Sequence, residues 1–78
     1  MNKSELSQIL RQEGFRPDAY NLEGGFPDES YSLEESNGVW SVYYSERGLK
    51  TGKKDFSNES AACVYLLQLL RKDASTQS

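Results

Sequence analysis

Two adjacent carboxylates, Glu34 and Glu35, are the side chains in this chain of 78 residues that first suggest catalysis. A pair of carboxylates can act as general acid and general base on a glycosidic bond when both reach the same substrate. The segment that contains them predicts a β-strand, in which neighbouring side chains point to opposite faces. The two groups therefore cannot share a substrate, and we expect no glycosidase site.

The other residue types that carry chemistry are scarce. The chain has no histidine and one cysteine, Cys63. Histidine is the commonest general base and metal ligand, and one cysteine provides neither an internal disulfide nor a thiolate-rich metal site. The apolar neighbours of Cys63 predict a buried, unreactive thiol. The pair Asp28 and Glu29 lacks the ligand spacing of a calcium site. We therefore expect that the protein is not an enzyme and uses no metal or cofactor.

A glycine-lysine pair, Gly52 and Lys53, raises the question of a phosphate-binding loop. A Walker-type loop needs this pair to follow a strand and to open a helix. Here the pair leads into a predicted strand at 53–56, so we interpret it as the tip of a hairpin.

Charge is distributed unevenly along the chain, whose formal net charge is −3. The stretch 18–46 contains seven carboxylates and no Lys or Arg. Four cations then follow within eight residues: Arg47, Lys50, Lys53 and Lys54. An acidic stretch can be a solvated surface that maintains solubility, or a patch that attracts a basic partner, and the sequence leaves both interpretations open.

The elements that position these charges follow from caps, turns and periodicity. Asn2 and Glu5 form a predicted capping box for a first helix, and Gly14 is its stop signal. A short strand is predicted at 19–23. The pair Asn37 and Gly38 predicts a type I′ turn between strands at 30–36 and 39–47.

This turn fixes the register of the hairpin. It pairs Glu35 with Trp40, Leu33 with Val42 and Tyr31 with Tyr44 on an apolar inner face. The opposite face is polar and carries Glu34 and Tyr43, so Tyr43 is expected to be exposed among acidic residues, where an aromatic side chain can anchor an interface. The alternative is that Tyr43 covers the sheet or packs under the C-terminal tail.

A second turn is predicted at 48–52, followed by the strand at 53–56 and by a helix that starts at the cap Ser57 and ends near Lys72. Its apolar arc is wide enough to contact both the sheet and the first helix. Residues 73–78 are small and polar, and we expect a disordered tail. The predicted fold is one α+β domain over 1–72, in the order α-β-β-β(-β)-α, with three or four antiparallel strands and both helices packed on one face.

Localisation and assembly are predicted from what the sequence lacks. No apolar run approaches the ~18 residues that cross a bilayer, and the polar N-terminal segment does not read as a secretory signal. We expect a cytoplasmic protein that makes no membrane contact and is monomeric when free.

The order of helix, strands and helix also resembles a double-stranded-RNA-binding domain. That family places a lysine cluster at the start of its second helix to grip phosphates. Here the corresponding positions are Asp55, Ser57, Asn58 and Glu59. The acidic sheet would also repel a nucleic-acid backbone. These two differences argue against a double-stranded-RNA-binding domain. A nucleic-acid-binding module that uses Arg47, Lys50, Lys53 and Lys54 is kept as an alternative, as is a protein-interaction adaptor.

One stretch carries a family resemblance. The segment Trp40-Ser41-Val42-Tyr43-Tyr44-Ser45-Glu46-Arg47-Gly48, followed by Phe56, Glu59, Ala62-Cys63, Tyr65 and Leu67, resembles small immunity proteins of bacterial polymorphic-toxin and contact-dependent growth inhibition systems. The resemblance implies a cytoplasmic protein that binds a cognate toxin domain, such as a basic nuclease, and blocks it. Register and charge select the candidate contact residues: Glu34, Tyr43, Glu46, Asp28, Glu29 and Arg47.

Overall fold

The first helix, α1 (Lys3–Gln12), begins at the predicted capping box in the computed structural model, which describes residues 1–23 and 29–73. The Asn2 side chain accepts a hydrogen bond from the Glu5 N–H, and the Glu5 carboxylate accepts one from the Asn2 N–H. Gly14 ends the helix with a φ of 79°. The Phe15 N–H then donates to the Leu10 carbonyl, which folds Phe15 back into the core.

The hairpin of β2 (Ser30–Ser36) and β3 (Val39–Glu46) confirms the predicted register, including the pair Leu33 and Val42. Asn37 and Gly38 have φ values of 51° and 80°, the left-handed conformations that a type I′ turn requires. The Glu35 carboxylate accepts a hydrogen bond from the Gly38 N–H and reinforces the turn.

The sheet has four strands in the order β1-β2-β3-β4 and is mixed, so the prediction of a fully antiparallel sheet is wrong. After a short 3-10 helix (Pro17–Ala19), β1 (Tyr20–Asn21) pairs in parallel with β2. β1 is also shorter than the predicted strand at 19–23. The Asn21 side chain accepts a hydrogen bond from the Glu23 N–H, which turns the chain away at this point.

The fourth strand, β4 (Leu49–Phe56), is twice the predicted length. Its turn lies at Arg47 and Gly48, not across 48–52, and both residues have positive φ. Gly52 also has a positive φ, of 62°, but it lies inside the strand at the register shift opposite Tyr43. A glycine in this conformation is typical of a β-bulge, so Gly52 bends the strand without ending it.

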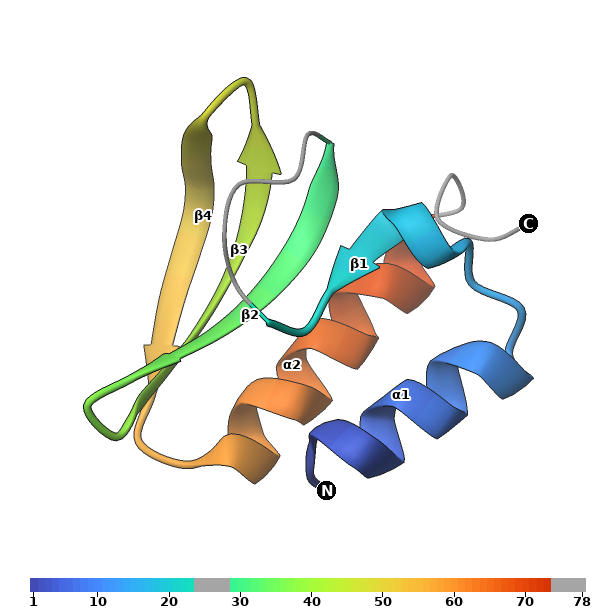
Figure 1. Ribbon diagram of the computed structural model, residues 1–78, viewed down its shortest axis with the longest axis horizontal. Helices are drawn as coiled ribbons and strands as arrows, with labels where there is room; N and C mark the ends of the chain where they lie inside the picture. The colour runs from blue at the N-terminus through green and yellow to red at the C-terminus, as the bar shows by residue number, and fades with distance from the viewer. Residues whose placement is uncertain (24–28, 74–78) are drawn as a thin grey trace.

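The second helix, α2 (Glu59–Lys72), starts one residue later than predicted, because Asn58 and not Ser57 caps it by accepting from the Ala61 N–H. It packs against β2, β3, β4 and α1. Figure 1 shows the strands and the two helices that build this arrangement. Near the start of α2, the Glu59 carboxylate accepts a hydrogen bond of 2.9 Å from the Lys3 N–H, so the first turns of the two helices are joined.

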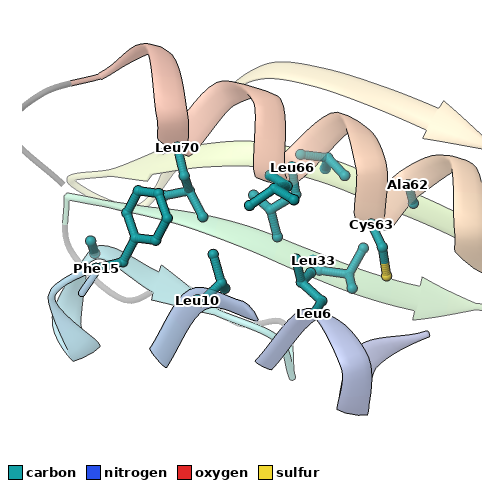
Figure 2. Packing of buried hydrophobic residues seen from close by; sticks show 11 residues of the cluster. Leu6, Leu10, Phe15, Leu33, Ala62, Cys63, Leu66 and Leu70 are labelled. Atoms are coloured by element: carbon teal, nitrogen blue, oxygen red, sulfur yellow. The ribbon is translucent and has the colours of Figure 1, made fainter. Parts of the chain in front are cut away.

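The core lies between the helices and the inner face of the sheet. Leu6 and Leu10 of α1 meet Leu66 and Leu70 of α2 over Leu33 of β2, as Figure 2 shows. These leucines are fully buried. At ~1.5–3 kcal/mol for each buried leucine, this cluster is a major source of the stability that fixes α2 over the sheet.

The end of α2 corrects the prediction of a tail that begins at residue 73. Asp73 is the C-terminal cap of α2, and its carboxylate accepts a hydrogen bond of 3.0 Å from the Tyr31 hydroxyl. The described part of the domain therefore includes Asp73. The tail predicted for 74–78, like the candidate contact residue Asp28, lies outside the described residues.

Candidate functional site

The predicted outer face of the β2-β3 hairpin is not the solvent-exposed surface that the sequence indicated. Tyr43 does lie on this face, opposite Ser32, but its side chain is fully buried. Ser30, Ser32, Ser41 and Ser45 on the same face are buried as well. The prediction that Tyr43 is an exposed aromatic anchor is therefore wrong, and the alternative that Tyr43 covers the sheet describes it better.

A lysine on the neighbouring strand explains part of this burial. Lys50 pairs with Ser45 across β3 and β4, and its Nζ lies 4.8 Å from the centroid of the Tyr43 ring. The same ammonium group is 3.3 Å from Glu34, whose carboxylate also accepts a hydrogen bond of 3.1 Å from the Tyr43 hydroxyl. Glu34, Tyr43 and Lys50 thus form a network that holds the outer face together, and none of them is a free contact residue.

Most of the other carboxylates also have partners within the fold. Glu13 binds Arg71, and this hydrogen bond holds the pKa of the Glu13 carboxyl below its ordinary value. The further carboxylates with an intramolecular partner are Glu5, Asp18, Glu23, Glu35, Asp55, Glu59 and Asp73. For these residues the acidic composition reflects caps, turns and ion pairs within the domain.

Two of the predicted contact residues, Glu29 and Glu46, differ from the rest. Within residues 1–23 and 29–73, no cation forms an ion pair with either of them. Ser30 pairs with Ser45, so Glu29, directly before β2, and Glu46, the last residue of β3, lie at the same end of the sheet. Two carboxylates at one end of a sheet can attract a partner with a basic surface.

The turn beside them, Arg47-Gly48, is strained in a way that the other hairpin is not. Both turns place two consecutive residues at positive φ, but the first central position is Asn37 in one and Arg47 in the other. Asn is favoured there because its short side chain tolerates the left-handed region, whereas a longer L-residue costs about 1–2 kcal/mol. Backbone strain of this kind concentrates at functional sites.

The most exposed large apolar side chain of this region is not among the contact residues predicted from the sequence. Leu49 is 65% exposed and lies directly after the turn, opposite Glu46. The turn predicted at 48–52 includes Leu49, so no strand position was assigned to this residue. In the structure the turn consists of Arg47 and Gly48 alone, and Leu49 is the first residue of β4. The recurrence of the type I′ pattern, with glycine at the second central position, is the signal that would have found it.

We call Glu29, Glu46, Arg47 and Leu49 the sheet tip. Figure 1 shows the β3-β4 turn projecting from one end of the sheet, away from α1. The structure therefore brings together three of the predicted contact residues, adds Leu49, and separates them from Glu34 and Tyr43. An exposed leucine flanked by charged residues can bind a protein surface.

Metal-ligating side chains and the thiol of Cys63 are the other groups that could carry chemistry. No group of three or more His, Cys, Asp or Glu side chains among them is arranged to hold a metal ion. Cys63 is buried, and this burial is the main cause that raises the pKa of its thiol. Within the same part of the chain, neither helix has the length and apolar character needed to cross a bilayer.

Comparison with known proteins gives no further assignment. No protein-family model, curated protein or solved structure matches this chain.

Proposed function

We propose that this protein is an inhibitor of the immunity-protein type, which binds a bacterial toxin domain and blocks it through the sheet tip. The observation that carries the proposal is the exposure of Leu49 directly after a strained turn, at the same end of the sheet as Glu29 and Glu46, two carboxylates without an ion-pair partner in the described chain. The family resemblance of the segment around Trp40 to Gly48 supports the same role.

The sheet tip has the composition that a protein interface needs. An apolar side chain that becomes buried on binding provides affinity, and surrounding charges provide orientation and a faster encounter with a partner of opposite charge. The two free carboxylates favour a partner with a basic surface. A nuclease is a protein of this kind, because its own substrate is a polyanion.

Co-expression tests the function directly. The toxin encoded by a neighbouring gene is expressed with this protein, and growth and complex formation are measured by co-purification and calorimetry. We expect protection and a stable complex. A toxin that stays lethal, with no complex, would show that the immunity role is wrong.

Variants of the sheet tip then test the site separately. The double variant Leu49→Ser, Glu46→Lys is expected to weaken the complex by about 100-fold, equivalent to about 2.7 kcal/mol, with an unchanged free energy of unfolding. The matched control is Val64→Ser combined with Asp18→Lys, since Val64 is 40% exposed on α2 and Asp18 is an exposed acid away from the tip. Protection and affinity equal to wild type in the tip variant would move the interface elsewhere.

A nucleic-acid-binding role has one observation in its favour. Lys54 Nζ lies 5.0 Å from the ring centroid of Tyr65 and 5.8 Å from that of Phe56, and cations beside aromatic rings occur in single-strand binding sites. Lys50, however, is engaged by Glu34, so part of the predicted basic cluster serves the fold. RNA affinity that falls steeply with salt and is lost in Lys53→Gln, Lys54→Gln would favour this alternative.

A further inference from the structure

A groove of about 570 Å³ lies between α1 and β1, on surface that the sheet tip does not include. One wall is a polar face of α1 with Lys3, Ser7 and Arg11, and the other is the segment from Tyr20 to Glu23. The volume is within the range of about 300–1,000 Å³ that is usual for ligand sites. Polar and apolar atoms contribute equally to the lining, which is less apolar than is usual for pockets that bind small molecules.

The charges of the groove are unequal at its two ends. Lys3 Nζ is 3.4 Å from the Glu23 carboxylate, so this cation is neutralised within the fold. Arg11 has no carboxylate of the described chain within ion-pair distance. A guanidinium group binds a carboxylate through two parallel hydrogen bonds, so the Arg11 end of the groove favours a ligand that carries a carboxylate.

The strand wall adds a second recognition element. β1 is the first strand in the sheet order, so it has β2 on one side and no strand of the described chain on the other. A strand at a sheet edge can pair with an extended peptide, and a helix beside that edge then forms the second wall of the peptide site. Hydroxyl and amide side chains on the α1 wall, from Ser4, Ser7 and Gln8, can hydrogen-bond the peptide backbone.

We propose that the groove between α1 and β1 binds an extended peptide segment whose carboxylate is held by Arg11. The dimensions agree with this assignment. Lys3 and Arg11 are eight residues apart on α1, which corresponds to about 12 Å along the helix. About four residues of an extended chain cover that distance. The segment lies beside β1 and its carboxylate reaches the Arg11 end, either as a C-terminus or as an Asp or Glu side chain.

Selection from a phage-displayed library of random linear peptides against the intact protein tests the proposal. We expect the enriched peptides to share an Asp, a Glu or a required free C-terminus. The synthesised peptides should shift the backbone amide resonances of Ser4, Gln8 and Leu22. Amidated copies of the same peptides show whether the C-terminus or a side chain provides the carboxylate.

Three variants make the test specific. Arg11→Glu should weaken peptide binding by at least about tenfold, and Ser7→Trp should do so by filling the groove. Lys72→Glu makes the same charge change on an exposed residue outside the groove and should leave affinity unchanged. Circular dichroism confirms that each variant is folded, and Arg11→Gln provides a milder substitution if Arg11→Glu is not.

Several results would overturn the proposal. The selection would do so by giving no binder, or binders without any carboxylate. Resonance shifts confined to other surfaces would do so as well, and so would equal peptide affinity for the wild type and the Arg11 variants. Equal shifts with free glutarate and with the peptides would mean that the site binds small carboxylates, not peptides. Because the groove excludes the sheet-tip residues, failure here leaves the toxin-inhibitor proposal untouched, and the reverse also holds.

Discussion

The Tyr43 hydroxyl donates a hydrogen bond of 3.1 Å to Glu34 on the neighbouring strand, while Lys50 reaches both residues from β4. This contact converts two predicted interface residues into parts of the fold. It also explains why an aromatic side chain is stable on a face otherwise made of serines and charged residues. The outer face of the sheet is a second buried layer, and its loss should be measurable as a loss of stability.

Tyr43→Ala should lower the free energy of unfolding by about 3–5 kcal/mol, because it removes a fully buried aromatic ring. Tyr43→Phe keeps the ring and removes the bond to Glu34, for an expected loss of about 1 kcal/mol. Urea denaturation measures both. Tyr65→Phe is the matched control, and a Tyr43→Ala protein as stable as the wild type would contradict the buried position.

The contact between Tyr31 and Asp73 predicts a dependence of stability on alkaline pH. Burial, with the hydrogen bond to Asp73, raises the pKa of Tyr31 to about 12 from its ordinary 10.0. Because the folded state retains this proton longer, the stabilisation is complete below pH 10 and is lost as the pH rises towards 12. Thermal denaturation across this range should show a steeper decline for the wild type than for Tyr31→Phe. Identical slopes would rule out the shift.

The two type I′ turns allow the backbone strain at Arg47 to be measured at the other hairpin. Asn37 and Arg47 both have a φ of 51°. The substitution Asn37→Arg therefore places an arginine in the β2-β3 turn with the φ that Arg47 has in the β3-β4 turn. We expect the free energy of unfolding to fall by about 1–2 kcal/mol, since a long L-side chain replaces one that tolerates the left-handed region. Asn37→Asp, which keeps a turn-forming residue, is the control. No change in the Arg variant would mean that position 47 is not strained.

Cys63 should react with thiol reagents only when the domain opens. The side chain is fully buried, and the raised pKa of its thiol reduces the thiolate that reagents attack. Modification by an aromatic disulfide reagent is expected to be slow in native buffer, to follow the unfolding rate, and to be rapid in urea. Fast labelling of the native protein, at a rate independent of stability, would disprove this.

The parts of the fold that the sequence predicted correctly depend on local chemistry. The α1 cap, its stop at Gly14 and the register around Asn37-Gly38 each follow from residues within a few positions of each other. The parallel pairing of β1 with β2 joins Tyr20 to Tyr31 and has no local signature. It depends on contacts between segments that are not adjacent in the sequence.

The candidate site was predicted in part, for related reasons. Glu29, Glu46 and Arg47 could be predicted as contact residues from the distribution of charge, because the acidic stretch 18–46 and the cations that follow it are visible in the sequence. Burial of Tyr43 was not visible, since it depends on Lys50 reaching across from a strand whose start was mistaken for a turn. The exposed position of Leu49 was not predicted either, because the turn was expected to be longer than it is.

The hydrogen bond from the Lys3 N–H to Glu59 spans 56 positions of the sequence, and it has a kinetic consequence. A helix of ten residues such as α1 is too short to persist alone in water, where about 12–15 residues are marginal. α1 therefore gains its full stability only after α2 has formed, so we expect one cooperative folding transition with no helical intermediate. During synthesis, the segment of α1 would stay unstructured until α2 had left the ribosome.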